Sequence, residues 1–300
     1  MWEQWYKIKL NIWKSEQEPK DQRSLFQNYM GTLADRPIND ITKPELNELL
    51  LPIFQSKWHR AKRLRLAIKG VFDYAVDYLN AVESSPVPGH DLYKAMKPKS
   101  KPHGTCELEQ LPNVVKTCFT GQHPMVNKLC LLLTLVTAHR FNVTRWGMWE
   151  HYDDETSTWA IPEKFHDSNE VGTKSFRGFK QWCPPLLMQR IKELNPDSPF
   201  FFPYPGRVNP VISENSVTNL LKDFYPKLTV HGVARNSAMI FGMKREYPSW
   251  VCHSFLDHAP SANHALDPSY ARDPNMYWDK RRELAQEYWP FIISKLDGWS

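Results

Sequence analysis

The sequence predicts a mainly α-helical protein with a small antiparallel β-sheet, made of a helical first block and an α+β second block. Apolar residues recur at helical spacing through residues 1–83. Two short segments, 158–162 and 179–183, have the aromatic and β-branched composition of strands. Residues 84–106 are rich in proline and lysine and cannot continue a helix. We therefore expect a helical domain at 1–83, a basic linker at 84–106 and an α+β domain at 107–300.

Length and composition exclude several classes of protein. The 300 residues are 41% hydrophobic and 24% charged, which is typical of a globular chain. The longest apolar run, 129–136, is too short to cross a bilayer, and the chain does not open with a secretion signal. Five cysteines without C-x-x-C spacing argue against a disulfide framework or a zinc ribbon. We expect a cytoplasmic, nucleoid-associated protein of a bacterial or archaeal cell, without metal, cofactor or membrane contact.

The first block contains several predicted helices. Residues 2–13 place Trp5, Ile8 and Ile12 on one helical face, and residues 24–33 form a second helix. A third begins after Thr42, which is a favourable N-cap, and proline and glutamate follow in its first turn. In residues 58–78, apolar positions recur every three or four residues.

The helix at 58–78 also carries an unusual charge pattern. Between residues 57 and 71 there are six cations and no acid, whereas a merely solvated face usually mixes signs to gain ion pairs. We expect this face and the linker lysines to contact DNA phosphates. These residues are Lys57, Arg60, Lys62, Arg63, Arg65 and Lys69 on the helix and Lys97, Lys99 and Lys101 in the linker.

The second block alternates helices with the predicted strands. A buried helix and turn occupy residues 126–145, and helices follow the strands at 184–194 and 216–224. Another helix begins with His231 and Arg235. The chain closes on an apolar helical segment at 285–300, and we expect this segment to dock onto a neighbouring protomer.

The order of the polar motifs in the second block resembles the tyrosine recombinase (phage integrase) family, in particular integrases of satellite phages and pathogenicity islands. The motifs are Thr137-Ala138-His139-Arg140, Gly172-Thr173-Lys174-Ser175, His231-Gly232-Val233-Ala234-Arg235, Leu256-Asp257-His258 and Tyr270. The first block is similar to the core-binding domain of that family at residues 37–42 and 68–75. The likeness covers nearly the whole chain, and the ordered set is more specific than any one motif.

The resemblance implies a role for each polar residue in cutting and rejoining DNA without a cofactor. Tyr270 would be the nucleophile, with Tyr277 as its competitor, and Lys174 the general acid, with Lys164 and Lys180 nearby. Arg140 and Arg235 would clamp the phosphate, a planar bidentate task that suits arginine. His231 and His258 would handle protons and bind the phosphate.

The sequence departs from the family pattern in three places. The family pair is usually His-x-x-Arg, but here three residues separate His231 from Arg235. One extra residue turns a helical side chain by about 100°, so we expect either a later helix start or a displaced His231. Val143 replaces the usual acid after Arg140, and the spacing from His258 to Tyr270 is long. Since the chain begins where the core-binding block would, we also expect no arm-binding domain of the kind common in such integrases.

The expected function is a site-specific recombinase that integrates or excises a mobile element, such as a viral genome, through a phosphotyrosine intermediate. The resemblance implies double-stranded attachment sites, a tetramer on DNA formed from free monomers, a directionality factor and a host DNA-bending protein. The alternatives are a non-catalytic DNA-binding protein of this fold and a type IB topoisomerase-like enzyme. A metal hydrolase built from Cys252, His253, His258 and His264 lacks a supporting motif.

Overall fold

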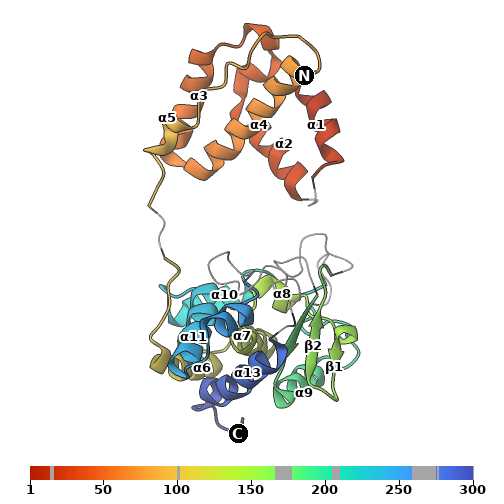
Figure 1. Ribbon diagram of the computed structural model, residues 1–300, viewed down its shortest axis with the longest axis vertical. Coiled ribbons are helices and arrows are strands. Elements are labelled where there is room, and N and C mark those ends of the chain that lie inside the picture. Colours follow the sequence, from red (N-terminus) through yellow and green to blue (C-terminus); the bar gives the residue numbers. More distant parts are fainter. Residues whose placement is uncertain are drawn as a thin grey trace. The chain divides into compact units, whose positions relative to one another are not determined.

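The computed structural model describes residues 1–13, 17–99, 102–165, 178–204, 210–258, 275 and 277–299. The chain forms two compact units, Met1–Lys101 and Pro102–Ser300 (Figure 1). The first is helical, and the second combines helices with a small antiparallel sheet, as the sequence predicts. Within the described residues, no helix is both long and apolar enough to cross a membrane.

The N-terminal unit is built around one long helix. Its elements are α1 (Trp2–Leu10), α2 (Gln17–Tyr29), the 3₁₀ helices η1 (Gly31–Asp35) and η2 (Ile38–Asp40), α3 (Lys43–Ser56), α4 (Trp58–Asp77) and α5 (Asp91–Lys94). Helix α4 packs against α1, α2 and α3. A capping box between Thr42 and Glu45 starts α3, which confirms the predicted N-cap.

The apolar face of α4 is buried as its spacing predicts, whereas the prediction for residues 2–13 holds only for Trp5. Ala61, Leu64 and Ile68 are at most 2% exposed. Trp5 is buried as predicted, but Ile8 of α1 and Ile12 after it face solvent, and Trp2 and Tyr6 are buried with Trp5. The face that carries the aromatic rings removes more apolar area from water, and Trp2 stacks on Phe26 at 3.9 Å.

The expected linker is shorter than residues 84–106. Tyr93 is fully buried, stacks on Phe54 at 3.9 Å and donates a hydrogen bond to Asn47 at 2.8 Å. The Trp58 indole donates to the Tyr93 carbonyl at 3.0 Å. Residues 84–96 therefore pack as part of the N-terminal unit, because Tyr93 anchors them in its core.

The C-terminal unit places a ring of helices and one sheet around a central helix. Its first helices are η3 (Leu108–Gln110), α6 (Leu111–Thr120), α7 (Met125–Thr137), α8 (Phe141–Arg145) and η4 (Trp149–His151). The sheet, in the order β1-β2-β3, has strands β1 (Tyr152–Asp153), β2 (Thr158–Ile161) and β3 (Phe179–Trp182). The later helices are α9 (Pro185–Leu194), α10 (Ser216–Phe224), α11 (Val230–Lys244), α12 (Ser249–Phe255) and α13 (Trp278–Ile293).

Sheet register and the central helix fix the position of the polar motifs. Strands β2 and β3 pair antiparallel, with Thr158 opposite Trp182 and Ile161 opposite Phe179. Helix α7 is apolar almost all round and contacts α8, α9, α10, α11 and α13. The ends of α7 and α11 are consequently held in one rigid core.

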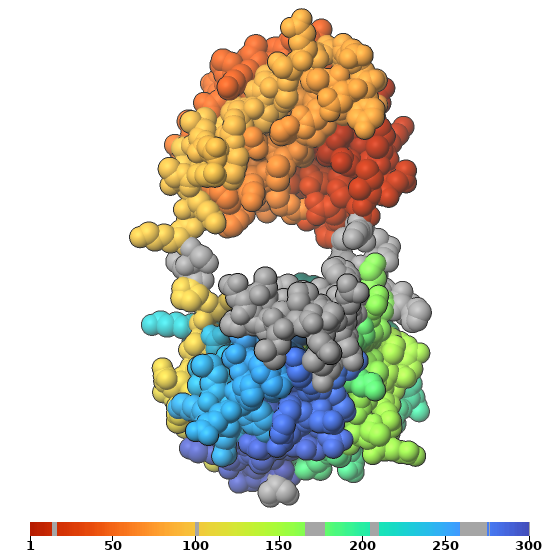
Figure 2. Space-filling view, in the orientation of Figure 1, coloured from red at the N-terminus to blue at the C-terminus, as the bar shows by residue number. Residues whose placement is uncertain are grey.

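The C-terminal helix packs in the core of its own unit, which favours the alternative that it folds back on its own domain, while docking of residues 285–300 onto a neighbour stays a prediction. Figure 2 shows the dark blue surface of α13 between the lighter blue of α11 and the green of the sheet. Helix α13 packs on β3, α6, α7 and α12. The side chains buried there are Arg281, Leu284, Ala285, Tyr288, Ile292 and Ile293.

Truncating one of these side chains tests the role of α13. Leu284 is 1% exposed, so Leu284→Ala should lower the free energy of unfolding by about 2–5 kcal/mol, through lost burial and the cavity left behind. Urea denaturation followed by circular dichroism measures this. Gln286→Ala, on the exposed face of the same helix, is the control and should change it by less than about 0.5 kcal/mol. Equal stability of the two variants would return α13 to a docking role.

Candidate active site

Ala138, whose backbone is in the left-handed region, ends α7 and redirects the chain toward Arg140. Helix α7 ends at Thr137, and Ala138 adopts φ +52° and ψ 18°, a conformation that costs a non-glycine residue about 1 kcal/mol or more. The chain then turns so that Arg140, half-buried, becomes the N-cap of α8. The strained turn thus sets the start of α8 directly beside the end of the central helix.

Arg235 connects three segments that are distant in the sequence. It lies on α11, whose first turn is capped by the Thr229 hydroxyl accepting from the Gly232 amide at 3.0 Å. The buried guanidinium donates to the Ala138 carbonyl at 3.2 Å and to the Leu256 carbonyl at 2.7 Å. The same nitrogen that reaches Leu256 lies 2.5 Å from His258 Nε2.

The charge of Arg235 is maintained at neutral pH despite its burial. Burial, together with the neighbouring charge of Arg140, lowers the pKa of Arg235 to about 10. The buried Asp257 carboxylate opposes that shift. Two guanidiniums close enough to influence each other form a positive site suited to one anion.

His258 has a defined role in this hydrogen-bond chain. Because a guanidinium only donates, His258 Nε2 accepts from Arg235, and the proton of a neutral ring is on Nδ1. That Nδ1 lies 3.3 Å from His253 Nδ1, which places a second histidine behind the first. These contacts hold the His258 ring in one orientation and the Arg235 guanidinium in place.

His231 lies on the same face of α11 as Arg235. The helix begins at Val230, so the expectation of a later start is wrong, and His231 is helical. Residues four apart on a helix are neighbours one turn apart. The His231 side chain is exposed, and its ring centroid is 4.6 Å from that of His103.

Several predicted site residues lie outside the described residues. These are Lys174, Tyr270, Lys101 and His264. Their competitors are described: Lys164 and Lys180 have exposed side chains, and the Tyr277 ring packs on Trp250 at 4.1 Å. That contact holds the Tyr277 ring against α12.

Two residues beside the site were missed from the sequence. His139 is fully buried, and burial lowers its pKa to about 3, so it is neutral; the positive charges that add to this shift belong, in decreasing order, to Arg235, Arg281 and Arg140. Arg281 is 1% exposed, stacks over Phe179 at 4.0 Å and donates to Asn275 at 3.5 Å. Its place on the apolar stripe of α13 is the signal that could have identified it.

The predicted phosphate-binding face of α4 needs correction. Arg65 is 7% exposed and donates to the Pro88 carbonyl at 2.6 Å, so it cannot reach a phosphate. Arg63 is paired with Glu18 and Asp21 of α2, and Lys69 with Asp73. Residues 57–71 contain no acid, but the fold brings acids from outside this run against two of its cations. The cations whose side chains remain exposed are Lys57, Arg60 and Lys62 on the helix and Lys97 and Lys99 after it.

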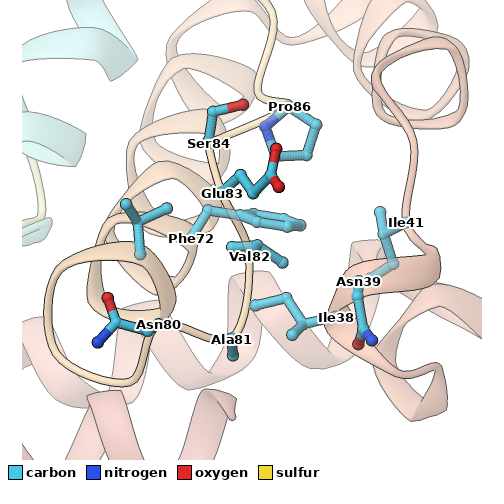
Figure 3. A pocket seen from close by; sticks show the side chains of 11 residues that line it. Ile38, Asn39, Ile41, Phe72, Asn80, Ala81, Val82, Glu83, Ser84 and Pro86 are labelled. Atoms are coloured by element: carbon cyan, nitrogen blue, oxygen red, sulfur yellow. The ribbon is translucent and has the colours of Figure 1, made fainter.

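A cavity of about 600 Å³ in the N-terminal unit is not a second candidate active site. It opens between η2 and the end of α4, over Ile38 and Phe72 (Figure 3). Glu83 is the charged group among its lining residues, so it lacks the cations that an anionic substrate needs. Among the described residues there is also no cluster of three or more metal-ligating side chains.

The chain is similar to known proteins in both sequence and fold. Residues 1–86 match the family model of the phage integrase central domain. The integrase of Enterobacteria phage P4 is 25% identical over 199 residues, which is 61% of this chain and 44% of that protein. Prophage integrase IntA of Escherichia coli K12 is 23% identical over 302 residues, covering 99% of this chain and 70% of IntA. The chain thus matches less than half the length of the phage P4 integrase.

Two solved structures share the fold. A dimer of lambda integrase residues 75–356 bound to a COC′ core site gives a TM-score of 0.66 at 15% identity, over 89% of this chain and 96% of that one. Residues 82–397 of the Tn1549 transposon integrase, in complex with circular intermediate DNA, give 0.63 at 10% identity, over 90% and 97%. Residues 1–86 thus match a phage integrase central domain, the chain is similar in sequence to phage and prophage integrases, and it shares the fold of these DNA-bound integrases.

Proposed function

We propose that this chain is a site-specific DNA recombinase that cuts and rejoins strands through a covalent 3′-phosphotyrosine intermediate. The observation that carries the proposal is the buried Arg235 guanidinium, which joins the turn before Arg140 to His258. Two arginines and a histidine from three separate segments converge there. Such convergence suits a phosphodiester, whose two non-bridging oxygens carry the charge.

In the proposed reaction, the Tyr270 oxygen attacks phosphorus in line. The bond from phosphorus to the tyrosine oxygen forms, the bond to the 5′ oxygen breaks, and Lys174 supplies the proton that the departing oxygen needs. Attack by a 5′ hydroxyl of the partner strand reverses these steps and releases Tyr270. The energy of the original phosphodiester is retained in the covalent link, so no cofactor is required.

The arginines would stabilise the transition state. Charge grows on the non-bridging oxygens as the phosphorus becomes five-coordinate, and the preorganised donors of Arg140 and Arg235 match it. Removing one such donor costs about 10²–10³ in rate in comparable oxyanion sites. His258 would orient Arg235 through Nε2, and His231, one turn away on α11, would donate to the phosphate or accept the tyrosine proton.

The proposed partners are double-stranded attachment sites and further copies of the chain. Among structures with this fold, lambda integrase is found as a dimer on a core site and as a tetramer on a Holliday junction. We propose that this chain, a free monomer, likewise assembles on DNA, with a directionality factor and a DNA-bending protein as accessory partners. The alternative, a degenerate DNA-binding protein of the same fold, is motivated by Val143 in place of the family's acid.

Replacing the nucleophile tests the chemistry. Tyr270→Phe should retain DNA binding and lose all covalent adduct, since only the attacking oxygen is removed. The substrate is a pool of nicked duplexes of randomised sequence, from which DNA captured covalently by the wild-type chain is recovered and reused with every variant. Denaturing gels measure the adduct, and gel shifts measure binding.

Tyr277→Phe is the matched control and should form adduct like the wild type. An adduct that persists in Tyr270→Phe, or a peptide map that places the DNA on Tyr277, contradicts the assignment. DNA binding without any adduct in the wild type supports the degenerate alternative.

The exposed cations of α4 give a separate test of DNA contact. Replacing Lys57, Arg60 and Lys62 by Gln should flatten the slope of log K against log salt by about 2–3, because each lost phosphate contact removes about 0.9. The control replaces three exposed lysines of the other unit by Gln, namely Lys116 on α6, Lys192 on α9 and Lys295 just after α13. It should keep the wild-type slope. Equal slopes for both variants would make the α4 face a solvated surface.

A further inference from the structure

The segment that leads into the C-terminal unit is attached to the helix that carries Arg235. This linker clasp, residues 102–105, runs beside α11 in Figure 1. The Gly104 carbonyl accepts from the Thr229 amide at 3.0 Å and from its hydroxyl at 3.2 Å. Thr229 is the N-cap of α11, so the clasp and the start of that helix share one hydrogen-bonded residue.

Two glycines allow this close approach. A Cβ atom on Gly104 would lie 1.7 Å from the Lys227 carbonyl oxygen, and one on Gly232 would lie 2.3 Å from the Gly104 carbonyl oxygen. No real side chain fits at such distances. The backbone of the clasp is therefore seated on the turn before α11 and on its first turn.

The clasp places a histidine ring against the predicted catalytic histidine. The His103 and His231 ring centroids are 4.6 Å apart, with the planes inclined by 56°. Both side chains are exposed, and the ring of His103 lies against that of His231. His103 directly precedes Gly104, whose carbonyl is hydrogen-bonded to Thr229.

We propose that His103 is a positioning residue for His231, holding its ring over the face of α11 that carries Arg235. The inference rests on the proposed recombinase function, because it concerns the site at which the phosphate would bind. Its consequence is that the covalent connection between the two units also supports a catalytic side chain. Loss of an aromatic contact of this kind lowers a rate about two- to tenfold.

The test compares His103→Ala with His103→Phe. His103→Ala should lower the rate of adduct formation on the captured nicked duplex two- to tenfold, without changing DNA affinity. His103→Phe should restore the rate, because it keeps a ring and removes the titratable nitrogens. In a His231→Ala background, His103→Ala should have no further effect. His123→Ala, which removes another histidine of the same unit, is the control and should keep the wild-type rate.

A second readout does not depend on activity. Imidazole resonances of ¹⁵N-labelled histidine should show a shift of the His231 signals in His103→Ala and their return toward wild type in His103→Phe. Unchanged His231 signals overturn the inference, as does a rate unaffected by His103→Ala, an effect additive with His231→Ala, or failure of Phe to rescue. If the wild-type chain forms no adduct but the His231 signals behave as expected, the contact stands and the recombinase function is what fails.

Discussion

The buried guanidinium of Arg235 is the interaction on which the rest of the candidate site depends. Its hydrogen bonds go to the carbonyl of Ala138, to the carbonyl of Leu256 and to the ring of His258. These partners come from the end of α7 and from the turn after α12. A single side chain thus sets the relative positions of three segments that the proposed chemistry needs together.

The partners of Arg235 explain how a buried cation can serve an anion. Burying a charge is costly, and structural ion pairs usually offset the cost with a carboxylate. Here the direct hydrogen-bond acceptors are carbonyls and a neutral imidazole, which satisfy the donors without neutralising the charge. Burial and repulsion by the Arg140 charge together lower the pKa of Arg235 to about 10. In the proposed reaction, a phosphate that enters between the arginines would relieve this repulsion, so that binding energy would be directed to the reacting group.

Local pattern predicted local structure well, and it failed where the determining partner is distant in the chain. The buried face of α4, the N-cap at Thr42 and the strands β2 and β3 follow from spacing and composition alone. The acids that pair with Arg63 come from α2, more than forty residues earlier, so a scan of α4 could not find them. The apolar segment at 285–300 was equally ambiguous, because one apolar helix face can pack either in the core of its own domain or against a neighbouring protomer. The ordered polar motifs predicted Arg140, Arg235 and His258, but not the buried Arg281 behind them.

The extra residue between His231 and Arg235 connects the departure from the family pattern to the linker clasp. On a helix, three residues turn a side chain by about 300° and four by about 400°, so both spacings keep the pair on one face, on opposite sides of the arginine. Because α11 begins before His231, the longer spacing moves the histidine ring around the helix and one residue further from Arg235. The His103 ring lies against that of His231, on a segment that two glycines and the Thr229 cap bring against the same turn.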